Sequence, residues 1–138
     1  MLRGLAHVDL VCRDVDRSIA FYLAVLGDLG LEPPVTFEGE RGESIYYMRF
    51  PGDGSGSFGL REASGPEASQ EFELYAPGFH HIAFAVSEPA DVDRAHEAAV
   101  SAGAEVLHAP RAWPEYHPDY YGTFFLDPDG FRVEVRSR

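Results

Sequence analysis

The tetrapeptide Asp14-Val15-Asp16-Arg17 occurs again as Asp91-Val92-Asp93-Arg94. Each copy opens a helical pattern and follows a short apolar strand that begins at a histidine, His7 in the first copy and His81 in the second. Internal repetition of this kind is the signature of a fold built from similar units. The 138-residue chain therefore predicts two modules of about 70 residues each.

Hydrophobic periodicity and turn residues predict the same order in both modules: strand, helix, then three strands. In the first module we expect a strand at 7–12, a helix capped by Asp14 or Asp16 and ended by Gly27 or Gly30, and strands near 35–37, 44–50 and 57–62. In the second we expect a strand at 82–86, a helix at 90–102, a strand at 105–108, and a hairpin of 122–126 and 131–136. Tight turns are expected at 51–54 and 127–130. This is an α+β pattern of two tandem βαβββ modules.

A segment rich in Ser, Gly, Pro and Glu at residues 63–77 is typical of a linker. It separates module one, about 4–62, from module two, about 78–138. Because the chain length is close to the usual size of one domain, we expect residues 1–138 to form a single domain.

Composition and charge exclude several classes of partner. The formal net charge is −12 and no stretch clusters basic residues, which disfavours nucleic acid and anionic membranes. No apolar run approaches the roughly 20 residues that cross a bilayer, and the amino terminus lacks the features of a secretion signal. We therefore expect a cytoplasmic protein. The single cysteine, Cys12, lies in an apolar run and is expected to be a buried thiol.

Successive side chains of a strand point to opposite faces, so apolar residues identify the helix-covered side. The alternation leaves three metal-binding side chains on the open side: His7, His81 and Glu134. Two imidazoles and one carboxylate suit one divalent ion such as Fe, Mn, Ni, Co or Zn, with positions left for water or substrate. The alternative is that the histidines are hydrogen-bonded structural residues.

Four segments carry a resemblance to a known family: 7–10 (His-Val-Asp-Leu), 16–22 (Asp-Arg-Ser-Ile-Ala-Phe-Tyr), 78–84 (Gly-Phe-His-His-Ile-Ala-Phe) and 127–134 (Asp-Pro-Asp-Gly-Phe-Arg-Val-Glu). In these segments the chain resembles the vicinal oxygen chelate superfamily, which includes glyoxalase I, extradiol dioxygenases, fosfomycin-resistance enzymes and bleomycin-resistance proteins. The resemblance covers nearly the whole chain. It implies paired βαβββ modules that form a curled, cup-shaped mixed sheet around a cleft.

The resemblance also implies a function. It places the metal ligands at His7, His81 and Glu134, and it implies an enzyme whose small-molecule substrate chelates the metal through vicinal oxygens. Dioxygenase, lyase or isomerase, and thiol-transferase reactions are all found in the family. The alternative is a metal-free, drug-sequestering protein of the bleomycin-resistance type. A homodimer is expected, since sheet edges need covering and members of the family commonly pair.

Many family members have a fourth ligand on the last strand of module one, where the candidate here is Glu62. Phe58 and Leu60 look packed, and Glu62 shares their face. Gly59 and Arg61 then point toward the cleft. We therefore expect the three-ligand form of the site.

The loop at 113–121 contains side chains that can carry a proton, and we expect His117 and Tyr121 to be catalytic. The alternative is that these aromatic residues only cover the sheet edge. His80 is expected on the packed side, with the other two histidines, His96 and His108, at the surface. Two cleft-facing residues, Arg49 and Arg61, either hold an anionic group or pair with the many acids; the sequence leaves both open.

Overall fold

The computed structural model describes residue 1 and residues 4–52 and 56–138. The chain divides into two compact units, residues 1–70 and 71–138, and each is described here by itself. The division falls within the stretch at 63–77 that the sequence predicts as a linker. Neither described helix combines the length and the apolar character that crossing a bilayer requires.

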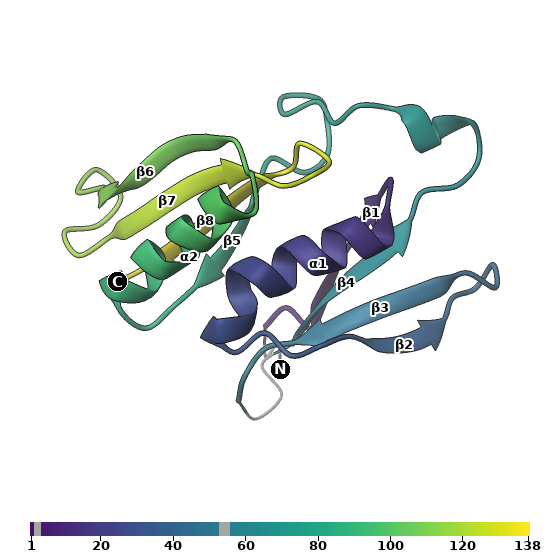
Figure 1. Ribbon diagram of the computed structural model, residues 1–138, viewed down its shortest axis with the longest axis horizontal. Coiled ribbons are helices and arrows are strands. Elements are labelled where there is room, and N and C mark those ends of the chain that lie inside the picture. Colours follow the sequence, from purple (N-terminus) through teal and green to yellow (C-terminus); the bar gives the residue numbers. More distant parts are fainter. Residues whose placement is uncertain (2–3, 53–55) are drawn as a thin grey trace. The chain divides into compact units, whose positions relative to one another are not determined.

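The first unit follows the predicted order of elements (Figure 1). It contains strand β1 (His7–Cys12), helix α1 (Val15–Leu26), the short 3-10 helix η1 (Gly27–Leu29), strands β2 (Val35–Glu38), β3 (Ser44–Arg49) and β4 (Ser57–Glu62), and the 3-10 helix η2 (Pro66–Ser69). The sheet order is β1-β4-β3-β2, with β1 parallel to β4 and the other pairs antiparallel.

Helix α1 begins where the sequence predicts. The Asp14 side chain accepts a 2.9 Å hydrogen bond from the backbone N–H of Arg17, which satisfies a donor that has no partner within the helix. The helix ends at Leu26, and Gly30 closes the following turn with φ of 106°, a conformation that favours glycine. Its apolar side packs on the sheet, with Phe58 completely buried against Tyr22.

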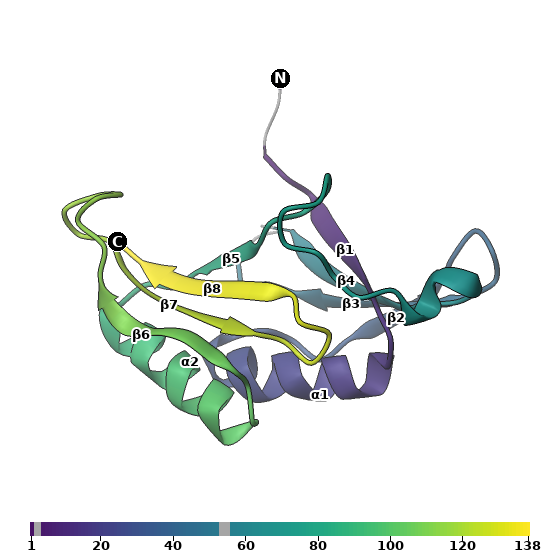
Figure 2. The same cartoon turned by 90° about the horizontal axis from the view of Figure 1, so that it is seen from above.

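The second unit repeats this plan with strand β5 (Ile82–Ala85), helix α2 (Pro89–Ser101) and strands β6 (Val106–Ala112), β7 (Tyr121–Leu126) and β8 (Arg132–Ser137). Its sheet order is β5-β8-β7-β6, with β5 parallel to β8. In each unit the helix lies along one face of its own sheet, which leaves the other face free of helix (Figure 2). The expectation of an α+β fold with two βαβββ modules is confirmed.

Most element bounds lie within a few residues of those expected. Strand β6 is longer than predicted, because register shifts on both sides of His108 let it continue to Ala112. In the turn at 127–130, the Asp127 side chain accepts hydrogen bonds from two backbone N–H groups. Part of the turn expected at 51–54, residues 53 and 54, lies outside the described residues.

Candidate metal site

The open face of the second sheet carries the predicted ligand Glu134. Its Cα pairs with Ala83 on one side and with Phe124 on the other, so these three side chains share one face. The small side chain of Ala83 leaves space above strand β5. Glu134 is nevertheless 97% buried, since only 3% of its surface is exposed.

Two groups contact the buried carboxylate of Glu134. The Nε2 atom of His81 lies 3.1 Å from Oε2, and the hydroxyl of Tyr120 donates a hydrogen bond to Oε1. The His81 side chain keeps 35% of its surface exposed, so this pair is reachable from solvent. An imidazole nitrogen and a carboxylate oxygen are both donor types that suit a divalent metal, and here they lie within 3.1 Å of each other.

A second histidine supports the first. Nδ1 of His80 lies 2.8 Å from Nδ1 of His81, so one ring donates a hydrogen bond to the other. A metal ligand at Nε2 of His81 requires the proton on Nδ1, and His80 is placed to accept it. The expectation that His80 lies on the packed side is wrong. Strand β5 begins only at Ile82, so strand alternation does not extend to His80.

Aromatic rings surround this pair on the open face. The Phe124 ring, 4% exposed, lies 6.2 Å from the ring of His81, 5.7 Å from His108 and 5.2 Å from Trp113. His108 is exposed, as expected. His96 is half-buried rather than at the surface, because its Nδ1 lies 3.4 Å from the hydroxyl of the buried Thr123 on the helix-covered side.

The environment of Tyr120 keeps its phenol protonated. Burial raises the pKa to about 12, and the hydrogen bond to the Glu134 carboxylate acts in the same direction. Tyr120 is therefore a neutral hydrogen-bond donor at physiological pH. It fixes one oxygen of Glu134 and leaves the other directed toward His81.

We expect Tyr120 to ionise about two pH units above an ordinary tyrosine in chelator-treated protein. Because its folded pKa is the raised one, its stabilising contribution is complete below pH of about 10 and is lost as the pH rises through about 12. The measurement is tyrosinate absorbance against pH, subtracting Tyr120→Phe from wild type. The control is Tyr75→Phe, which removes a tyrosine that is 85% exposed. A wild-type minus Tyr120→Phe midpoint near 10 would contradict the assigned environment.

The third predicted ligand, His7, lies at the start of β1 in the first unit. Its side chain is exposed, and its ring meets Tyr47 edge-on with centroids 5.5 Å apart. The alternation predicted for this strand is confirmed, because Leu10 and Cys12 are buried and Val11 is 55% exposed. His7 therefore belongs to the open face of the first sheet.

An acid network occupies the same face of the first unit. The Oδ2 atom of Asp9 accepts hydrogen bonds from the Tyr47 hydroxyl at 3.0 Å and from Nε and Nη2 of Arg61 at 3.0 and 2.8 Å. Burial, and next the hydrogen bond to Asp9, raises the pKa of Tyr47. A Cβ on Gly59 would lie 2.4 Å from Oδ1 of Asp9 and 2.7 Å from Cε1 of Tyr47, so a larger residue there would displace these side chains. The charge of Asp9 is paired with that of Arg61.

The register identifies the residue of β4 that is equivalent to Glu134. Asp9 pairs with Gly59 as Ala83 pairs with Glu134, so the position equivalent to Glu134 is a glycine. Glu62 pairs with the buried Cys12 and lies on the helix-covered side of the strand. The strand parity predicted for Glu62 is confirmed.

The structure gives the two predicted catalytic residues different surroundings. His117 is exposed, and its Nδ1 accepts a 3.2 Å hydrogen bond from the backbone N–H of Asp119. Tyr121 pairs with Ser137 and donates a 2.9 Å hydrogen bond to Asp93 of helix α2, which places it on the helix-covered side. Their catalytic roles stay predictions. The tyrosine that contacts the predicted ligand Glu134 is Tyr120, which the sequence does not single out.

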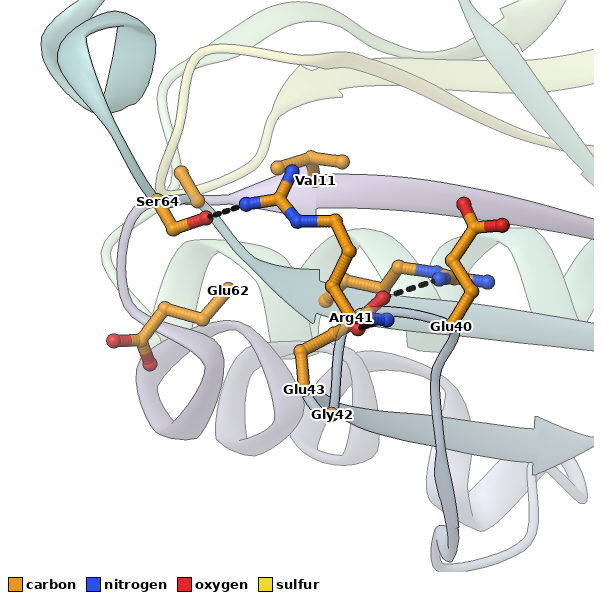
Figure 3. A pocket seen from close by; sticks show the side chains of 9 residues that line it. Val11, Glu40, Arg41, Gly42, Glu43, Glu62 and Ser64 are labelled. Carbon is orange, nitrogen blue, oxygen red and sulfur yellow. Dashed lines mark hydrogen bonds and ion pairs between the residues drawn. The ribbon is translucent and has the colours of Figure 1, made fainter.

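The arginines predicted for module one are paired with acids. Arg49 bonds to Glu32 at 2.8 Å, and Arg61 bonds to Asp9 and, at 2.7 Å, to Glu43. A cavity of about 590 Å³ lies beside this network, where Nη2 of Arg41 donates to Ser64 (Figure 3). Of the two described arginines that line it, Arg61 is paired with acids and Arg41 bonds to the Ser64 hydroxyl.

The structure thus brings two of the three predicted ligands together. Within the described ranges, no cluster of three His, Cys, Asp or Glu side chains is close enough to bind a metal ion. His81 and Glu134 meet in the second unit, and His7 belongs to the first.

Comparison with known proteins identifies relatives along the whole chain. The model of the Glyoxalase/Bleomycin resistance protein/Dioxygenase superfamily matches residues 4–135. Glyoxylase I 4 of Arabidopsis thaliana is 31% identical over 134 residues, which span 97% of this chain and 70% of the relative. The uncharacterized protein YwkD of Bacillus subtilis (strain 168) is 29% identical, with 98% of this chain and 97% of YwkD covered.

Solved structures show the same fold. The glyoxylase/bleomycin resistance protein/dioxygenase domain from Frankia sp. EAN1pec has a TM-score of 0.80 and 28% identity, with 99% of this chain and 98% of that chain covered. The fosfomycin resistance protein FosX from Listeria monocytogenes, complexed with Mn(II) and sulfate ion, has a TM-score of 0.66 and 18% identity, with 100% and 94% covered. The chain belongs to the Glyoxalase/Bleomycin resistance protein/Dioxygenase superfamily.

Proposed function

We propose that this protein is a metal-dependent enzyme that acts on a small substrate chelating the metal through two vicinal oxygens, with His7, His81 and Glu134 as ligands. The observation that carries the proposal is the convergence of Nε2 of His81 and Oε2 of Glu134, 3.1 Å apart on the open face. Superfamily membership supports this class of function. The Mn(II) bound by FosX is a property of that relative and supports a divalent ion here.

The residues of the second unit have separable roles in the proposal. With a metal bound at Nε2 of His81, His80 would accept the proton on Nδ1 and so hold that tautomer, and Tyr120 orients the carboxylate of Glu134. Both are positioning residues. A divalent ion held here supplies Lewis-acid stabilisation of negative charge that develops on a substrate oxygen.

The proposal is tested first by metal analysis of purified protein and then by binding of a bidentate oxygen ligand, acetohydroxamic acid, which is uncharged in neutral solution. We expect close to one divalent ion per chain, with Mn, Fe, Co, Ni and Zn assayed separately. We also expect acetohydroxamate to bind only when the metal is present. Retention of hydroxamate binding after complete metal removal would favour the metal-free sequestering function instead. The retained metal then defines the conditions for substrate screening.

The homodimer implied by the family resemblance is a separate prediction. Each sheet has two edge strands, and edges exposed in solution favour pairing with another chain. We expect sedimentation at micromolar protein in about 0.15 M salt, where surface charge is screened, to give twice the chain mass. A single species of 15.2 kDa would contradict the dimer.

A further inference from the structure

Two arginines on the open face of the second sheet lie on either side of Glu134. Arg132 and Arg136 are the positions two before and two after it in β8, so all three side chains point to the same face. Their Cα atoms lie about 7 Å from that of Glu134. Both guanidinium groups therefore belong to the surface on which the proposed substrate would bind.

Each of these arginines is held by an aromatic ring rather than by an acid. The guanidinium carbon of Arg132 lies 4.7 Å from the centre of the Phe124 ring, and that of Arg136 lies 5.1 Å from the centre of the Tyr120 ring. Stacking of this kind limits the side-chain motion that binding would otherwise have to restrict. The two cations are positioned in advance.

Neither arginine has an ion-pair partner among the described residues. Four other arginines do form ion pairs with acids: Arg49, Arg61, Arg94 and Arg111. The contrast is notable in a chain with a net charge of −12. In addition, Nε of Arg132 is buried and has no hydrogen-bond acceptor in the described part of the chain. Buried polar groups are normally satisfied, and this one has no acceptor from the described residues.

We propose that Arg132 and Arg136 bind an anionic group of the substrate, a carboxylate or a phosphate, next to the metal site. This inference rests on the proposed function and narrows the substrate class to small anions that also carry the chelating oxygens. The planar guanidinium suits both anions, because its parallel N–H donors match two oxygens of one acid. The Glu134 carboxylate is buried and contacts His81 and the Tyr120 hydroxyl, so its repulsion of a nearby anion is reduced.

The test uses the full chain freed of metal by a chelator, with inorganic phosphate and, separately, acetate as probes. All eleven basic residues are arginine, so the Nε–H signals in ¹H–¹⁵N spectra form a small set that can be followed individually. We expect saturable shifts of the Arg132 and Arg136 signals with a common dissociation constant. The probe that binds more tightly identifies the anion class.

The neutral variants Arg132→Gln and Arg136→Gln should each weaken phosphate binding about tenfold or more, as loss of a charge-assisted hydrogen bond predicts. The charge-retaining variants Arg132→Lys and Arg136→Lys should fall between these and wild type, because lysine lacks the fork geometry. The control is Arg94→Gln, which alters a 62% exposed arginine side chain on helix α2 and should leave binding unchanged.

Shifts that do not saturate, or equal weakening in Arg94→Gln, would overturn the anion site. Metal content measured on the same samples separates the two proposals. A protein that binds phosphate through these arginines but binds no metal contradicts only the metal-dependent function, whereas normal metal content without saturable anion binding contradicts only this inference.

Discussion

Replacement of Glu134 by alanine is expected to lower metal affinity by more than the 10–100-fold that loss of a group supporting a ligand typically causes. The carboxylate is the anionic member of the proposed ligand set, and its Oε2 faces Nε2 of His81. His81→Ala and His7→Ala should each also remove most of the bound metal. The measurement is metal content per chain after dialysis against metal-free buffer, with circular dichroism to verify folding.

Two variants sharpen this experiment. Glu134→Gln keeps an acceptor for the Tyr120 hydroxyl while removing the charge, so it separates loss of the ligand from loss of a buried hydrogen bond. Glu62→Ala removes an exposed carboxylate on the helix-covered side of β4, opposite to the open face, and should leave metal content nearly unchanged. Equal metal content in wild type and in the variant lacking all three ligands would refute the assignment.

Strand alternation predicted the face of a residue wherever the strand bounds were right. The predicted bounds of β1 and β4 agree with the structure, and Val11, Arg61 and Glu62 lie on the expected sides. The same reasoning could not find Tyr120. The sequence predicts the first strand of the last hairpin from Gly122, whereas β7 begins at Tyr121, whose side chain shares a face with the buried Thr123. Tyr121 therefore lies on the helix-covered face, whereas Tyr120, just before the strand, contacts Glu134.

Contacts that depend on where a strand begins or on how strands pair were also beyond the sequence. The contact between His80 and His81 arises just before β5 begins, where no alternation rule applies. The choice between anion binding and acid pairing at Arg61 was decided by Asp9 and Glu43, which lie 52 and 18 residues away along the chain. Only the register of the sheet shows that a glycine, Gly59, takes the position equivalent to Glu134.

Phe124→Ala is expected to destabilise the protein by about 3–5 kcal/mol, as truncation of a buried phenylalanine usually does. Its ring, 4% exposed, contacts the rings of His81, His108 and Trp113 and stacks under Arg132. For a chain of this size, the loss corresponds to a fall in Tm of about 10–20 °C. Since the ring also holds a proposed ligand and an anion-binding arginine in place, metal content and phosphate affinity should both decrease. Thermal unfolding and the two binding measurements check this.

The matched control is Phe37→Ala, which removes a phenylalanine from strand β2 that is 54% exposed and meets only the Tyr47 ring among the described aromatic contacts. It should change stability by less than about 1 kcal/mol.

Phe124→Leu keeps most of the buried volume but no aromatic ring, so it should recover much of the stability while binding phosphate less tightly than wild type. If Phe124→Leu restored phosphate affinity completely, stacking of Arg132 on the ring would have no role in holding the guanidinium. If Phe124→Ala and Phe37→Ala had the same Tm, the Phe124 ring would not stabilise the open face. The positions of His81 and Arg132 would then depend on other contacts.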